Sequence, residues 1–149
     1  MHFTKDVKLK KLIVLLLLLP FTSTYAKELT SFNAIYDSLS NGRNIKLVIH
    51  FDACDPKPPV SNVAVYTTPR AVMLRKNYVT FSNSPLTTNN PAYPNKPILE
   101  NITYKITNDE NLKVVMKTFT LPDYNLVNET SMNCPLKTAV RVYNVIFMG

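Results

Sequence analysis

The first hydrophobic residues after the N-terminal leader recur with a helical spacing. Within residues 31–40 the apolar positions fall at i, i+3, i+4 and i+7, and they are Phe32, Ile35, Tyr36 and Leu39. This spacing places them on one face of a short helix. Thr30 or Ser31 can cap the start of the helix, and Gly42 stands where a left-handed C-terminal cap is favoured. Because so short a helix is unstable alone in water, we expect it to pack on a sheet.

After the helix, apolar and polar residues alternate with a period of two, which predicts strands. Residues 44–51 alternate most cleanly, and residues 52–59, which include three prolines, end that strand. The sequence Asn-Asp-Glu-Asn at 108–111 predicts a hairpin turn, and Lys76-Asn77 predicts another. Further strands are expected at 62–67, 71–76, 78–82, 98–107, 112–121 and 138–148.

This order of elements predicts a mainly β (α+β) fold. The N-terminal short helix is expected to pack on a curled antiparallel sheet or a small β-barrel of six to eight strands in meander order. The segment 138–148 is the most apolar, so we expect it to lie centrally in the sheet, and a domain without its last ten residues should not fold. No linker or repeat divides residues 27–149, which therefore form a single domain.

The N-terminal segment has the order of a secretory signal peptide. Lysines precede an unbroken apolar run from Leu12 to Leu19, and the small residues Thr24 and Ala26 follow. The apolar run is well short of the roughly 20 residues that span a bilayer core. We therefore predict a signal peptide over residues 1–26, cleavage between Ala26 and Lys27, a periplasmic or secreted protein, and no stable membrane anchor after cleavage.

Composition and charge exclude several functional classes. The chain has two glycines, which excludes Gly-rich phosphate loops and dinucleotide fingerprints. Of the formal charge of +7, the four lysines and one aspartate of the leader account for +3, which leaves +4 on the mature domain. Its one tight basic group is Arg70, Arg75 and Lys76, so no nucleic acid is an expected partner. His50 is the one histidine beyond the leader, so no metal and no cofactor are expected.

The two cysteines, Cys54 and Cys134, both lie beyond the leader. Export delivers them to an oxidising compartment, where an even number of cysteines favours pairing. There is no Cys-x-x-Cys spacing of the kind that metal or redox sites use. We therefore expect a structural disulfide that joins the end of an early strand to the loop before the last strand.

The residues that would carry chemistry do not form a recognised constellation. A hydrolytic site would have to use His50, with Asp52 as the nearest acid along the predicted strand. No Gly-x-Ser-x-Gly elbow presents a nucleophile. No catalytic residue is therefore assigned, and a non-enzymatic role is favoured over an enzymatic one.

A proline-rich arm at residues 90–97 is the candidate recognition loop. It holds Tyr93 between Pro91 and Pro94 and carries Lys96. An aromatic side chain fixed by flanking prolines is pre-organised for binding at low entropic cost. The alternative is that Tyr93 packs down over the end of a sheet.

Several segments together resemble the VirK family of exported bacterial proteins. They are Leu29-Thr30-Ser31-Phe32 with Ala34 and Leu39, Asn41-Gly42, the strand that ends near Cys54, Thr80-Phe81, the arm from Asn90 to Pro97 and the closing Cys-containing segment. The resemblance covers essentially the whole mature domain. It implies an exported, virulence-associated protein of unknown mechanism and carries over no catalytic residue.

Three functional hypotheses follow from the sequence. The leading one is a binding domain for a host or envelope protein or for a small apolar ligand. The second is a hydrolase that uses His50 with Asp52. The third is a structural or chaperone-like component of the cell envelope.

Overall fold

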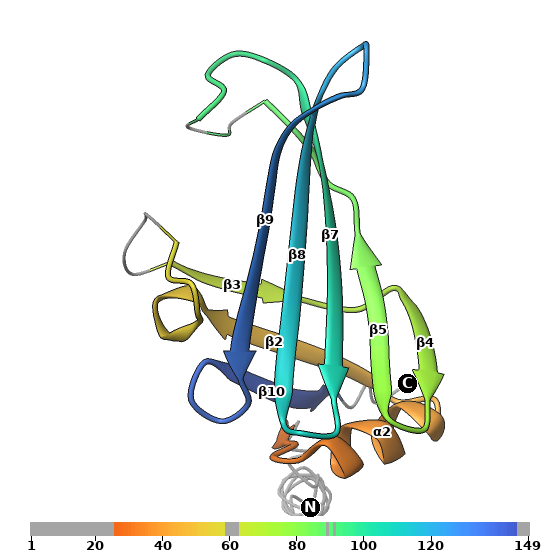
Figure 1. The fold of residues 1–149 in the computed structure, drawn as a ribbon. Coiled ribbons are helices and arrows are strands. Elements are labelled where there is room, and N and C mark those ends of the chain that lie inside the picture. Colours follow the sequence, from red (N-terminus) through yellow and green to blue (C-terminus); the bar gives the residue numbers. More distant parts are fainter. Residues whose placement is uncertain (1–25, 59–62, 89, 91, 146–149) are drawn as a thin grey trace, which may run out of the picture.

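The computed structural model describes residues 26–58, 63–88, 90 and 92–145. The predicted signal peptide up to Tyr25 lies outside this part of the chain. The described residues form two antiparallel sheets and a short helix, and the long strands of one sheet run across those of the other (Figure 1). The elements are β1 (Lys27–Glu28), α2 (Phe32–Ser40), β2 (Asn44–His50), the 3-10 helix η1 (Phe51–Ala53), β3 (Ala64–Thr67), β4 (Ala71–Arg75), β5 (Tyr78–Asn83), β6 (Leu86–Thr87), β7 (Ile98–Thr107), β8 (Asn111–Thr120), β9 (Asn125–Pro135) and β10 (Val140–Val145).

The first sheet brings together the two ends of the domain in the order β1-β10-β2-β3. β10 pairs with β2 along its whole length, from Val140 opposite Ile49 to Val145 opposite Asn44. The inward residues of the two strands alternate with exposed ones because strand side chains point to opposite faces in turn. The prediction that the apolar terminal strand lies inside a sheet is confirmed, since β10 lies between β1 and β2.

The second sheet is a meander in the order β4-β5-β7-β8-β9, with the short β6 paired to β7. The turn at Lys76-Asn77 is confirmed, because Arg75 of β4 pairs with Tyr78 of β5. The hairpin of β7 and β8 is confirmed as well, and its closing pair is Thr107 with Asn111. Within the predicted irregular segment 84–97, the structure adds the two-residue strand β6.

The expectation of one curled sheet or a small barrel is corrected to two separate sheets. The described residues form ten strands, more than the six to eight expected, and β1, β6 and β9 are the additional ones. The described strands do not close into a barrel, because β3 pairs with β2 alone and β4 with β5 alone. The chain leaves the first sheet through residues 68–70 and returns to it through residues 136–139. Pro69 in the first crossover has no amide hydrogen to continue a ladder, which favours a break there.

Helix α2 packs beneath the ends of both sheets (Figure 1), as the sequence predicts. Ser31 caps it by accepting a hydrogen bond from the Ala34 amide, and Gly42 adopts a φ of 72° just beyond its end. The carboxylate of Glu110, in the β7–β8 turn, accepts from the Phe32 amide at 3.0 and 3.2 Å. This contact satisfies an N-terminal amide that the helix leaves unpaired and fastens α2 to the second sheet. Within the described ranges, no helix is long and apolar enough to cross a membrane.

The core fills the space between the two sheets and α2. The disulfide between Cys54 and Cys134 is part of the core, with an S–S distance of 2.04 Å and both cysteines buried. Cys54 follows η1, at the end of an early strand, as the sequence predicts. The prediction for Cys134 is corrected: it belongs to strand β9 and not to the loop before the last strand. Beside the disulfide, the backbones of Asp55 and Asn133 exchange two hydrogen bonds of 2.8 and 2.7 Å. The disulfide therefore links the first sheet to the second.

Candidate functional site

His50 and Asp52 do not share a strand. His50 is the last residue of β2, and Asp52 lies in η1, where the chain turns away from the sheet. The alternation that would point both side chains the same way therefore ends before Asp52. The backbone amide of His50 donates to the Ala139 carbonyl at 2.8 Å. Neither residue lines the cleft between the two sheets that is described below.

The proline-rich arm lies between β6 and β7, at the end of the molecule away from α2 (Figure 1). Its described residues form tight turns: the Tyr93 amide donates to the Asn90 carbonyl, and the Lys96 amide donates to the Tyr93 carbonyl. The Asn90 side chain anchors the arm to β7 by donating to Glu100 at 2.8 Å. Tyr93 is half-buried and Lys96 is exposed. The role of these two residues in recognition stays a prediction, and they do not line the cleft.

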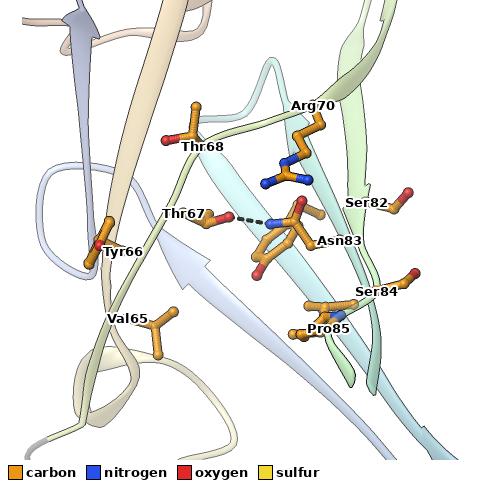
Figure 2. A pocket seen from close by; sticks show the side chains of 11 residues that line it. Val65, Tyr66, Thr67, Thr68, Arg70, Ser82, Asn83, Ser84 and Pro85 are labelled. Carbon is orange, nitrogen blue, oxygen red and sulfur yellow. Dashed lines mark hydrogen bonds between the residues drawn. The ribbon is translucent and has the colours of Figure 1, made fainter. Parts of the chain in front are cut away.

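An open cleft of about 570 Å³ lies between the two sheets. Its walls are β3 of the first sheet, the crossover 68–70, the end of β5 with residues 84–85, and part of β7. Its volume lies within the range of about 300–1,000 Å³ that is usual for small-molecule sites. Figure 2 shows which side chains are directed into the space between β3 and the end of β5: Val65, Thr67, Arg70 and Asn83. Tyr66 is also among the residues that line the cleft, and it is 75% exposed.

A polar cluster of three side chains crosses the cleft and joins the two sheets. Asn83 of β5 donates from Nδ2 to the Oγ1 of Thr67 on β3 (Figure 2). The Thr67 side chain is also hydrogen-bonded to Tyr104 of β7. Burial raises the pKa of the Tyr104 phenol above its ordinary value; the hydrogen bond with Thr67 opposes the rise, and the negative charge of Glu100 adds to it. Tyr104 is therefore neutral and protonated at physiological pH.

The apolar part of the cleft comes from residues on both sheets. Val65 and Ile102 are half-buried at its sides, and Pro85 lies at one end. Deeper in the second sheet, the ring of Tyr104 stacks on Phe81 at a centroid distance of 4.7 Å. This stacking fixes the orientation of the Tyr104 ring, because offset aromatic pairs favour one geometry. The cleft therefore offers apolar walls beside a fixed group of hydrogen-bonding side chains.

Arg70 supplies the charge of the cleft. It lies on the crossover and is exposed, with its guanidinium directed toward Asn83 (Figure 2). Among the residues that line the cleft there is no carboxylate. A search of the described residues finds no group of three or more His, Cys, Asp or Glu side chains that could hold a metal ion.

Sequence reasoning recognised Arg70 as part of a basic group but missed the cleft. Thr67, Asn83 and Tyr104 stand far apart in the sequence and carry no motif. The one available signal was the combination of Pro69 and Arg70 between two short predicted strands, which marks a break in the sheet with a cation at it.

Comparison with known proteins gives two matches. The family model described as VirK protein matches residues 28–124. A crystal structure of lpg1832, a VirK family protein from Legionella pneumophila, is similar at a TM-score of 0.73 and 25% sequence identity, over 77% of this chain and 97% of that chain. No curated protein matches the sequence.

Proposed function

The chain belongs to the VirK family, and from that premise we propose that it is an exported, virulence-associated binding domain that holds a small ligand in the cleft between its sheets. The observation that carries the proposal is the cleft itself. It combines a suitable volume, apolar side walls and a small number of convergent polar groups, which is the usual make-up of a ligand site.

The side chains that line the cleft indicate which kind of ligand it can hold. A purely apolar ligand would offer no hydrogen-bond partner to the guanidinium of Arg70, and covering a charged group without a partner is costly. A ligand with both a polar and an apolar part matches Arg70 and Asn83 on one side and Val65 and Ile102 on the other. We therefore propose an amphipathic small molecule in place of the apolar one that the sequence suggested.

Two features support export. Lys27, which would become the first residue after cleavage, begins β1 and pairs with Asn144 of β10, so cleavage after Ala26 leaves the first sheet complete. The disulfide between Cys54 and Cys134 suits an oxidising compartment. N-terminal sequencing of the protein recovered from the periplasm or the culture medium should begin at Lys27, and recovery of an intact leader would contradict the proposal.

A pair of substitutions tests ligand binding in the cleft. Val65→Trp narrows the cleft, whereas Leu126→Trp places the same side chain at an exposed position of β9 that does not line the cleft. Because the chain has no native tryptophan, each variant also carries a single fluorescent reporter. Native mass spectrometry of the exported protein and both variants detects any small molecule that is already bound. Solvent extraction of the same samples releases that molecule for identification, and a thermal-shift screen tests added amphipathic compounds.

We expect the unsubstituted protein and Leu126→Trp to carry or bind the same small molecules and Val65→Trp to lose them. Binding that survives in a folded Val65→Trp variant would place the ligand elsewhere. If no small molecule binds to the unsubstituted protein in any of these assays, the proposed small-ligand function is wrong.

A further inference from the structure

We propose that the cleft selects a ligand with an oxyanion headgroup on an apolar body, and that Arg70 binds the oxyanion. The inference rests on the proposed function, because it names the class of ligand for the same cleft. Arg70 is directed into the cleft (Figure 2), and the ion pair found among the described residues joins Lys117 and Glu129, on the far strands of the second sheet. The positive charge of Arg70 is therefore not neutralised by a carboxylate of the described chain.

A second cation lies near the first. Arg43, beyond the end of α2, and Arg70 line a smaller hollow of about 230 Å³ next to the crossover. The residues of this hollow also include no acidic side chain. Two guanidinium groups around one crossover create a positive potential, which attracts anions and repels cations. This arrangement favours an anionic ligand over a cationic one.

The polar cluster adds donors directed toward the same space. The Thr67 oxygen accepts from Asn83 Nδ2, and the Thr67 side chain is also hydrogen-bonded to Tyr104. An amide nitrogen has two hydrogens, so Asn83 has one left to donate to a ligand. Because burial raises the pKa of the Tyr104 phenol, this group stays protonated at physiological pH and adds no negative charge that would repel an oxyanion.

The nearest acidic group does not oppose this assignment. Glu100 interacts electrostatically with Tyr104 from the same strand, but it does not line the cleft. One of its oxygens is held by the Asn90 side chain at 2.8 Å, on the side of the arm. The charge that faces the ligand is therefore that of Arg70.

The guanidinium of Arg70 suits both carboxylates and phosphates, because its fork of donors matches two oxygens of either group. The shared chemistry is an oxyanion attached to an apolar chain that lies against Val65 and Ile102. Octanoate and octyl phosphate represent the two sources, and octanamide is their neutral counterpart with the same chain. Isothermal titration calorimetry of the exported, disulfide-bonded protein with these three probes measures the contribution of the charge.

Arg70→Gln tests the cation, and Arg75→Gln is its matched control, since it removes the same charge from an exposed position at the end of β4. We expect at least one of octanoate and octyl phosphate to bind at least about tenfold more tightly than octanamide, as a charge-assisted hydrogen bond provides. Arg70→Gln should remove this advantage, whereas Arg75→Gln should change affinity less than about twofold. Arg70→Lys keeps the charge without the fork and should retain part of the preference.

The outcomes separate this inference from the proposed function. Equal binding of octanamide and both anions, or unchanged anion affinity in folded Arg70→Gln and Arg70→Lys, would overturn the role of Arg70 while the cleft remained a ligand site. A preference for octanoate over octyl phosphate, or the reverse, identifies the source of the oxyanion. Absence of binding for all three probes would overturn the oxyanion class, and the wider screen with Val65→Trp would then decide the function on its own.

Discussion

Breaking the Cys54–Cys134 disulfide should lower the stability of the domain by several kcal/mol. The two cysteines are 80 positions apart, so the disulfide closes a loop that includes most of the second sheet. In the chain-entropy model, removing the constraint on a loop of that length costs about 4.5 kcal/mol. For residues 27–149 the unfolding entropy is about 0.26 kcal/mol/K, so the melting temperature should fall by about 17 °C.

The measurement is thermal unfolding by circular dichroism, with and without a phosphine reductant. The double variant Cys54→Ala/Cys134→Ala should melt close to the reduced protein and should not respond to the reductant. The reduced protein should still unfold cooperatively, because the paired backbones of Asp55 and Asn133 and the shared core continue to hold the sheets together. A fall in melting temperature of less than about 3 °C would refute the reasoning, since it would mean that the link hardly restricts the unfolded chain.

Three further predictions concern single contacts. Glu110→Ala should destabilise the domain by about 1 kcal/mol in urea unfolding, because the Phe32 amide loses its acceptor at the start of α2, and Glu110→Gln, which keeps an acceptor, should cost less; equal costs for the two variants would argue against this contact. Tyr104→Phe should flatten the alkaline end of the stability profile: burial raises the pKa of Tyr104 above the value of about 10 in the unfolded chain, so its contribution is complete below that pH and is lost as the pH rises through the folded-state pKa. Unfolding curves at pH 8 and pH 11 test this, and an identical loss of stability in both proteins would contradict it. Deletion of residues 140–149 should abolish cooperative unfolding, because it removes the strand between β1 and β2, whereas deletion of residues 146–149 leaves β10 complete and should not; limited proteolysis compares the two.

The elements that sequence predicted best are those whose signal is local. Helix α2 has its apolar stripe, its Ser31 cap and its Gly42 within a dozen residues. The β7–β8 hairpin has two alternating strands around an Asn/Asp-rich turn, and its strands begin and end within a residue of the prediction. In both cases the pattern that forms the element lies inside it, so no distant contact is needed to recognise it.

Strand β9 shows the opposite case. It runs from Asn125 to Pro135 but buries only Met132 and Cys134, and its other residues are polar or exposed. It lies at the edge of the second sheet, and its backbone pairs with β8 from Asn111 opposite Pro135 to Thr120 opposite Asn125. Its strand character therefore comes from the partner that β8 provides and not from its own side chains. An edge strand without a regular hydrophobic alternation gives no periodic signal.

The division into two sheets was not predictable for a related reason. A meander of hairpins is the simplest expectation for strands in this order, and residues 68–70 could equally have formed a hairpin turn between β3 and β4. The pairing of β10 with β2 decides the matter: their paired residues are about 95 positions apart, and the register matches apolar residues such as Val142 and Leu47. Once β10 occupies one side of β2, β3 takes the other side, and the rest of the meander forms a second sheet.

The cleft is a consequence of this division, which explains why its residues carry no motif. Thr67 is the last residue of β3, the edge strand of the first sheet, and Asn83 is the last residue of β5 in the second sheet. Arg70 lies on the segment that connects the two sheets. The position of each of these residues therefore depends on where a strand ends. The hydrogen bonds among Thr67, Asn83 and Tyr104 then hold the two sheets at a fixed separation. The polar cluster therefore has two physical roles, since it fixes the width of the cleft and also presents donors to whatever enters it. A relative that kept the two-sheet fold but replaced Asn83 or Thr67 by apolar residues would keep the core and lose the polar recognition, because none of the core strands depends on those side chains for its pairing.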